Sequence, residues 1–332
     1  MSRQSPILIV LSAGALWLLA TSQFAAAANT VKTRDTEPPP ADATSAVAPA
    51  ALAVDPAYAA YEDGRFVTAM TLAKTAAAAG EPAAHTLIGR MLSEGLGVPR
   101  DRVKAAAWFR KGADLGDGNA QFALGLLLAK GDGVPQDKAA AAKLFAQSAA
   151  QGNVPAKYNL GVLYVSGDGA PRDEKRGATL IGEAAKAGDA QARYDLAQLY
   201  LTGVGGTWSD SQAAHWMELA AQSGLADAQV EYAIMLYKGR GVARDPNRAA
   251  WFFTAAAEHG HPVAQNRLAN LYAFGIVYKK DLVTAAKWHL LGRSHGASDF
   301  KLDGILASLT AAQRQQADLD AADWLERNNP TP

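Results

Sequence analysis

Apolar residues recur through most of this chain at the spacing that places them on one face of an α-helix. In the stretch 84–92 they follow the i, i+4, i+7, i+8 pattern of such a face: Ala84, Ile88, Met91 and Leu92. Gly95 then ends the pattern, because glycine accepts the left-handed conformation of a helix C-cap. Asp101 stands where an N-cap side chain accepts the first unpaired amides of a second helix, which closes at Gly116. The pattern predicts two helices joined by a tight turn.

This helix–turn–helix pattern returns every 36 residues. Glycines mark the end of each unit at that interval: Gly80, Gly116, Gly152, Gly188, Gly224, Gly260 and Gly296. A small residue in the first helix, which lets the second helix approach closely, keeps the same interval: Gly89, Gly125, Gly161, Ala197, Ala233 and Ala269. Columns that stay in register without an insertion indicate a tandem array. We therefore predict six repeats over residues 81–296.

The repeats predict an all-α fold. One helix pair cannot bury its apolar side alone, whereas stacked neighbours share a continuous core. We therefore expect a right-handed α-solenoid of helix–turn–helix units whose two ends need covers. Residues 57–80 have the pattern of a degenerate repeat that caps the N-terminal end. Residues 297–332 are expected to form capping helices at the C-terminal end, where Thr310 and Gln313 have the spacing of a capping box.

The N-terminal residues predict export. Arg3 precedes an apolar run at 7–20, and the alanines at 26–28 fit a small-x-small cleavage site. The run is short for a membrane span. We therefore interpret residues 1–28 as a signal peptide and expect a periplasmic or secreted protein of a Gram-negative type of bacterium; an uncleaved N-terminal anchor in the inner membrane is the alternative. Residues 29–56, rich in alanine and proline, are interpreted as a disordered linker.

The repeat resembles that of a known family. Its pattern is similar to the Sel1-like repeats, relatives of the tetratricopeptide repeat, and the third unit carries the matching residues: Ala156, Leu160, Gly161, Tyr164, Gly167, Gly169, Asp173, Ala178 and Gly188. The resemblance extends over 81–297, roughly two thirds of the chain. It implies an adaptor or scaffold, and exported bacterial members look like regulators or assembly factors of the envelope. Several members carry paired cysteines in each repeat, whereas this chain has none.

Composition and charge remove several classes of function. Lysine plus arginine number 32, and so do aspartate plus glutamate. Because nucleic-acid binding depends on neutralising phosphates, and no basic run stands out, we expect no nucleic-acid partner. The lack of cysteine excludes disulfides, thiolate catalysis and cysteine zinc sites. A membrane is expected as a partner only through an uncleaved signal anchor.

No residue pattern predicts an active site. His259 and His261 form the tightest histidine cluster, but a metal site needs three or four converging ligands, and no further ligand recurs beside them. Ser298 and Lys301 match the S-x-x-K pattern of a serine nucleophile but lack its S-D-N and K-T-G partners. We therefore expect a protein that is not an enzyme and that holds no metal or cofactor.

Binding residues are expected where the repeats differ from one another. In related folds the first helix of each unit lines the concave side, and one stripe on these helices is polar in the later repeats: Asn159, Asp195, Gln198, Glu231, Lys238, Arg267 and Asn270. We predict that this stripe lines a hydrophilic groove for a partner, with plain solvated helix faces as the alternative.

Two turns also depart from the repeat by carrying an aromatic residue. Trp208 takes a position where other units have arginine, glutamine or lysine, and Tyr278 follows the loss of the second turn glycine. Trp208 either contributes to an interface, where tryptophan is enriched, or folds over its own unit. Tyr278 is either a contact or a divergence without a role.

Two functions follow from these features. The first is a non-catalytic periplasmic scaffold or adaptor that binds a partner protein or peptide of the cell envelope in the concave groove, and that regulates envelope signalling or assembly. The alternative is a module that binds glycan or peptidoglycan, because the rings of Trp208 and Tyr278 can stack on sugar faces. A row of exposed aromatic residues along one face would favour the alternative, and the sequence shows two.

Overall fold

The structure is a computed structural model that describes residues 55–206 and 208–328. Over these residues the regular secondary structure is helical and contains no strand. The predicted signal peptide, all but the last two residues of the predicted linker, and residues 329–332 lie outside the described residues. The expected all-α class is confirmed.

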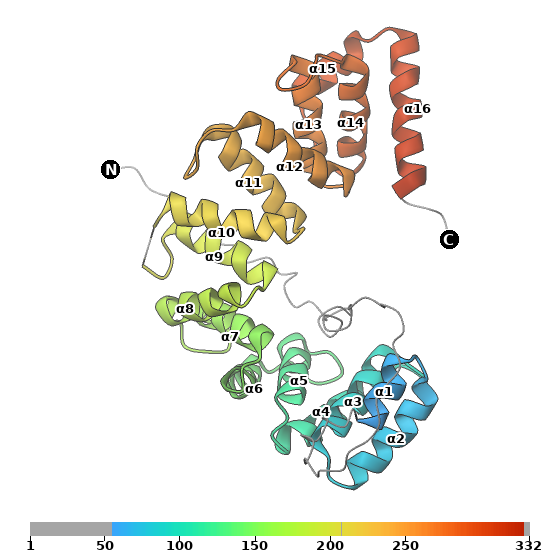
Figure 1. Ribbon diagram of the computed structural model, residues 1–332, viewed down its shortest axis with the longest axis vertical. Helices are drawn as coiled ribbons and strands as arrows, with labels where there is room; N and C mark the ends of the chain where they lie inside the picture. Colours follow the sequence, from blue (N-terminus) through green and yellow to red (C-terminus); the bar gives the residue numbers. More distant parts are fainter. Residues whose placement is uncertain (1–54, 207, 329–332) are drawn as a thin grey trace, which may run out of the picture. The chain divides into compact units, whose positions relative to one another are not determined.

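Helices joined by short turns follow one another along the described part of the chain (Figure 1). Their bounds are α1 Pro56–Glu62, α2 Phe66–Ala78, α3 Pro82–Glu94, α4 Arg102–Asp114, α5 Gly118–Lys130, α6 Lys138–Ala150, α7 Val154–Ser166, α8 Glu174–Lys186, α9 Ala190–Thr202, α10 Asp210–Gln222, α11 Ala226–Lys238, α12 Pro246–Glu258, α13 Pro262–Phe274, α14 Leu282–Ser294, α15 Phe300–Ser308 and α16 Ala311–Asn328. Every helix from α3 to α14 has 13 residues. A repeat thus consists of two helices of equal length and two turns.

The described residues form two compact units, one within 55–153 and one within 154–328. In the described part of the first unit, α1 packs on α2, α3 on α4 and α5 on α6, while α2 meets α3 and α4 meets α5. In the second unit the pairs from α7–α8 to α13–α14 are joined in the same way. Each unit is a stack of consecutive helix pairs, the arrangement of an α-solenoid.

The caps at the helix ends follow the sequence pattern. The second helix of each repeat begins after a side chain that accepts a hydrogen bond from an amide of its first turn: Asp101, Asp137, Asp173, Ser209, Asp245 and Asp281. The first helix ends at a glycine in the left-handed conformation, as at Gly95 with φ 79°. These caps satisfy the unpaired backbone groups of the helix ends and so fix where each helix starts and stops.

The two helices of one repeat lie very close together. A Cβ atom on Gly125 of α5 would be 2.7 Å from the ring of Phe145 on α6, and Gly89 of α3 has the same relation to Phe109 on α4. Interiors are packed too densely to absorb such an atom without movement. Later repeats have a fully buried alanine at this position: Ala197, Ala233 and Ala269.

At the C-terminal end, α16 covers the last repeat. The ring of Trp324 on α16 lies 6.1 Å from that of Trp288 on α14, in an edge-to-face arrangement with an interplanar angle of 67°. Ala317 and Ala321 are buried on the same helix. This contact removes from water the apolar side of α14 that a further repeat would otherwise cover.

Replacing Gly125 by leucine is expected to lower the free energy of unfolding by about 1–3 kcal/mol, the usual cost of overpacking a filled core. The matched control is Gly304→Leu in α15, because nothing lies within 4 Å of a Cβ atom added there. Urea denaturation followed by circular dichroism compares the two variants with the unaltered chain. Equal stability of the two variants would contradict the close approach of α5 and α6.

Candidate functional site

The predicted groove residues lie on the first helices of the repeats in the second unit. Six of them keep side chains that solvent reaches: Asn159, Gln198, Glu231, Lys238, Arg267 and Asn270. Lys238 and Arg267 are exposed, whereas the other four are half-buried. The side-chain amide of Asn159 donates a 2.8 Å hydrogen bond to the carbonyl oxygen of Pro155 in its own helix. These six residues remain candidates for contact with a partner.

Asp195 does not lie on this surface, and the expectation that it lines the groove is wrong. Its side chain is only 2% exposed. It accepts hydrogen bonds from the Tyr158 hydroxyl at 2.7 Å and from the Gln191 side-chain amide at 3.0 Å. Burial raises the pKa of the Asp195 carboxyl to about 6, although both hydrogen bonds favour its ionised form. Asp195 therefore joins α7 to α9 inside the stack.

Asn270 is also occupied by a structural contact. Its side-chain amide donates to the carbonyl oxygen of Asn266 at 2.8 Å and to a carboxylate oxygen of Asp299 at 3.0 Å. Asp299 is in turn the N-cap of α15. Asn270 therefore fixes the start of α15 to α13, while its half-buried side chain stays a predicted contact residue.

The two aromatic turn residues have different environments. Trp208 is 63% exposed, so it does not fold over its own repeat. Tyr278 is half-buried, and its ring stacks on that of Tyr272 with a centroid distance of 4.7 Å and an interplanar angle of 13°. The hydroxyl of Tyr278 lies 3.1 Å from that of Thr254 on α12. Tyr278 is therefore held against the fold on one side, while Trp208 faces solvent.

Sequence reasoning missed a second exposed tryptophan. Trp251 on α12 is 63% exposed. The other repeats carry small or polar residues in this column: Ala107, Lys143, Thr179, His215 and Lys287. The comparison of columns could have identified Trp251, because it is the one large aromatic residue in a column that is otherwise alanine, threonine, lysine or histidine.

A cavity of about 440 Å³ adjoins Trp251, and we call it the α12 pocket. It is lined by α12 and by the turn that follows α13, through Asn247, Trp251, Thr254, Ala255, Glu258, Val277 and Tyr278. The cavity has the size of a side-chain or small-ligand site. It lies entirely within the second unit.

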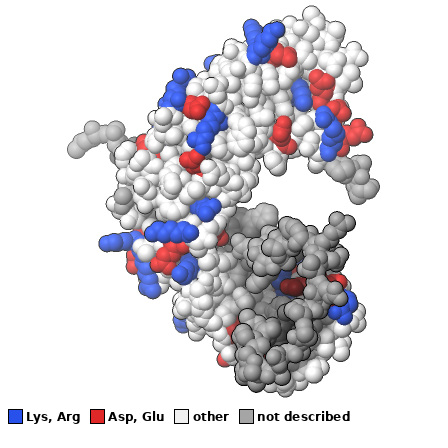
Figure 2. All heavy atoms as spheres, in the orientation of Figure 1, with Lys and Arg blue, Asp and Glu red and all other residues white. Residues whose placement is uncertain are grey.

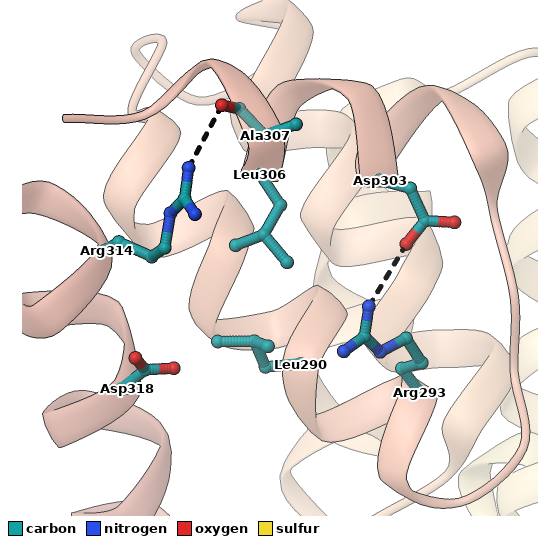
Figure 3. Close-up of a pocket in the computed structure, with 7 residues that line it drawn as sticks. All are labelled: Leu290, Arg293, Asp303, Leu306, Ala307, Arg314 and Asp318. Carbon is teal, nitrogen blue, oxygen red and sulfur yellow. Dashed lines mark hydrogen bonds and ion pairs between the residues drawn. The ribbon is translucent and has the colours of Figure 1, made fainter. Parts of the chain in front are cut away.

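A second cavity, of about 540 Å³, lies among the helices that cap the array (Figure 3). Its lining residues come from α14, α15 and α16: Leu290, Arg293, Asp303, Leu306, Ala307, Arg314 and Asp318. Arg314 points to the carbonyl oxygen of Ala307 and donates to it at 3.0 Å, and Arg293 pairs with Asp303 at 3.5 Å. Both arginines thus make contacts within the cap, so this cavity is a weaker candidate for a ligand.

The family follows from the match to the repeat model. The model of the Sel1 repeat matches six consecutive segments: 82–117, 118–153, 154–189, 190–225, 226–261 and 262–296. The chain belongs to the Sel1 repeat family. Sel1 repeats typically mediate interactions between proteins, and the members generally act as non-catalytic scaffolds.

Two solved structures of Sel1 repeat proteins resemble this chain. A Sel1 repeat protein from Oxalobacter formigenes is 29% identical, with a TM-score of 0.64, and the match covers 73% of this chain and 97% of that one. A protective antigen of uropathogenic Escherichia coli strains, described as displaying the same repeat fold, is 28% identical, with a TM-score of 0.54 and coverage of 83% and 68%. A search of curated proteins finds no match.

Histidines in this Sel1 repeat protein make structural contacts. His289 is fully buried and lies 3.0 Å from Asn266 through Nδ1 and 2.8 Å from Asp303 through Nε2. His261 caps α13 and pairs with Asp227 at 3.0 Å. Across the described residues, no three histidine, aspartate or glutamate side chains gather as a metal site would require.

The distribution of surface charge and the length of the helices are relevant to the predictions about nucleic-acid and membrane partners. On the face shown in Figure 2, basic and acidic side chains are interspersed and not separated by sign. This distribution agrees with the equal numbers of acidic and basic residues. None of the helices described here is both long enough and apolar enough to cross a membrane.

The buried carboxyl of Asp195 predicts a pH dependence of stability. Its pKa is raised from 3.8 to about 6 in the folded chain, so the folded state binds this proton more tightly than the unfolded state does. The contribution is fully present below about pH 4 and is lost as the pH rises through about 6. Between about pH 4 and about pH 7, we expect the free energy of unfolding of the unaltered chain to fall by on the order of 2 kcal/mol more than that of the Asp195→Asn variant.

Denaturation curves at several pH values measure this slope. Asp318→Asn on α16 is the matched control, because Asp318 is an exposed carboxylate of the same unit. The control should keep the slope of the unaltered chain. If Asp195→Asn keeps it too, the proton is not held at Asp195.

Proposed function

We propose that this Sel1 repeat protein is a non-catalytic scaffold of the bacterial cell envelope that binds a partner protein or peptide through its second unit. The observation that carries the proposal is a set of large apolar side chains exposed in that unit. Trp208 and Trp251 are each 63% exposed, and Phe274 is 52% exposed. Tryptophan and other aromatic residues are enriched where proteins bind one another.

The repeat framework does not require these three side chains. The column of Trp208 is otherwise Arg100, Gln136, Arg172, Arg244 and Lys280, and the column of Phe274 is otherwise Glu94, Lys130, Ser166, Thr202 and Lys238. Polar residues serve in the same structural positions elsewhere in the chain. An apolar residue there exposes surface to water without stabilising the fold, so a bound partner gives it a role.

The accessible stripe residues supply polar contacts in the same proposal. Lys238 and Arg267 are exposed and both carry a positive charge, while Glu231 and Gln198 are half-buried on neighbouring first helices. Charged side chains at the edge of an interface guide encounter and fix orientation more than they add affinity. We therefore assign binding energy to the aromatic residues and selectivity to the stripe.

Two features support a place in the envelope. The N-terminal residues have the pattern of a signal peptide, with an uncleaved inner-membrane anchor as the alternative. The similar solved Sel1 proteins come from bacteria. A partner in the periplasm, through which the protein would regulate envelope signalling or assembly, fits both features.

A glycan-binding module is the second candidate, because two tryptophans are exposed on the second unit. Aromatic faces of this kind stack on the apolar face of a sugar ring as readily as on a protein side chain. Binding of the purified chain to cell-wall glycan distinguishes this function from the scaffold.

Site-specific photo-crosslinking in intact cells tests the scaffold. A photo-reactive phenylalanine analogue is placed at Trp208 or at Trp251, and at Arg100 or Lys143 as matched controls, since these occupy the same two columns in the first unit. We expect one and the same partner protein to be crosslinked from the first two positions and not from the controls. Equal crosslinking from all four positions, or from none, would contradict the proposal. Retention on purified cell wall without any protein crosslink would favour the glycan module.

A further inference from the structure

The turn of the sixth repeat has a backbone conformation that its residue disfavours. Val277 has φ 69° and is the one residue other than glycine, within 55–206 and 208–328, with a positive φ. A β-branched side chain is a true outlier in this region. The other repeats place glycine in this column: Gly97, Gly133, Gly169, Gly205 and Gly241. Such strain persists where the surrounding structure maintains it and is concentrated at functional sites.

The glycines show what the turn does elsewhere. These glycines let the turn that follows the first helix of a repeat pack on the first turn of the second helix of the repeat before it. A Cβ atom on Gly133 would lie 2.6 Å from the backbone of Arg102, the first residue of α4, and one on Gly241 would lie 1.9 Å from the carbonyl oxygen of Asp210, the first residue of α10. At such distances no side chain fits between the turn and the helix.

Val277 brings a branched side chain to that position in the sixth repeat. The side chain is 41% exposed, and the α12 pocket lies beside it, between the turn and α12. Since a valine cannot adopt the close approach that glycine permits, we infer that Val277 keeps this turn away from α12 and thereby maintains the pocket.

The α12 side of the pocket is one helical face. Asn247, Trp251, Thr254, Ala255 and Glu258 follow the spacing i, i+4, i+7, i+8, i+11, which aligns them along the helix. Ala255 leaves space between the large ring of Trp251 at one end and the carboxylate of Glu258 at the other. The turn adds Val277 and the ring of Tyr278. Most of the wall is therefore apolar.

Few polar groups in the pocket are available to a ligand. The hydroxyls of Thr254 and Tyr278 lie 3.1 Å from each other, and Thr254 also donates to the carbonyl oxygen of Ala250 at 2.9 Å. Asn247 and Glu258 make no side-chain hydrogen bond or ion pair with any described residue, but 11 positions separate them. That is about 16 Å along the helix axis.

This arrangement favours a protein side chain over a sugar. A sugar ring presents hydroxyls around its edge and needs several polar partners close to it, which the pocket does not provide. An apolar side chain needs only the walls. Glu258 is exposed and is the only carboxylate that lines the pocket, so a cation in the ligand would be complementary to it. Lys279 and Lys280, which follow Tyr278, do not line the pocket.

We propose that the α12 pocket binds one large apolar side chain of a partner polypeptide, and that a lysine or arginine next to that residue in the partner pairs with Glu258. The proposal rests on the scaffold function and specifies where and how the partner is held. Trp251 forms the main wall, Val277 maintains the opening, and Glu258 selects the neighbouring charge.

Selection of a random peptide library on the purified mature chain tests the proposal. We expect the enriched peptides to share one phenylalanine, tryptophan, leucine or methionine with a basic residue close to it. The affinity of a selected peptide, measured by fluorescence anisotropy, should fall about 30-fold in Trp251→Ala, as at a binding hot spot. Phe300→Ala is the matched control, because Phe300 on α15 is an exposed aromatic residue of the same unit, at 81%, that lines neither the pocket nor the proposed interface, and it should leave the affinity unchanged.

Two further variants separate binding from folding. Val277→Gly should raise the midpoint of thermal unfolding, because it removes the backbone strain. It should also lower the affinity for the selected peptide about tenfold, because the turn can then approach α12. A variant that was merely unfolded would lose both properties. Glu258→Lys should reverse the selected charge, so that peptides with an acidic neighbour are enriched.

Three other results would contradict the proposed ligand of the α12 pocket, and each can be distinguished from the others. Enriched peptides that bind Trp251→Ala as tightly as the unaltered chain would show that the partner binds elsewhere, and the scaffold would stand. A library without any enriched peptide would refute the pocket, while crosslinking from position 208 would still decide on the scaffold. Displacement of the bound peptide by an oligosaccharide of N-acetylglucosamine would make the pocket a glycan site.

Discussion

The short distance between the two helices of a repeat is the constraint on which the rest of the structure depends. A glycine or alanine of the first helix lies directly beneath a large side chain of the second, as Gly125 lies beneath Phe145. Such a pair has little interior of its own, so its remaining apolar surface must pack on the next pair. The caps keep this contact in register, because only helices that begin and end at equivalent residues can bring the same columns together in every repeat.

This constraint explains which features the sequence could predict. The glycine and aspartate columns report backbone conformation and capping directly, so the repeats and their caps follow from spacing. Depth of burial does not follow from spacing. Asp195 shares a column with the exposed Arg267, and it is buried because Tyr158 and Gln191 supply its hydrogen bonds. Trp251 lies on a second helix, whereas the predicted binding residues lie on first helices and turns, although its column differs from those of the other repeats.

The last repeat differs because its outer neighbour is not a repeat. In the column of the second helix that packs against the small residue of the first, the other repeats carry apolar side chains: Phe109, Phe145, Ile181, Met217 and Phe253. The sixth has His289, which is fully buried and reaches both Asn266 and Asp303. A buried polar network is specific in its geometry and costly when half satisfied. It therefore orients α15 on the array, which apolar packing alone would leave less defined. A single histidine in the sequence gave no sign of this role.

The order of contacts along the chain has a consequence for how the protein forms and opens. Helices contact mainly their neighbours in sequence, and the contacts that skip a helix, such as that between α14 and α16, remain short in range. Local contacts of this kind favour rapid folding. They also let stability vary from one repeat to the next, so that a terminal helix can open while the centre of its unit stays folded. In this protein, α15 and α16 could detach from the sixth repeat without disturbing the repeats before it, and the array would then end in an uncovered apolar side on α14.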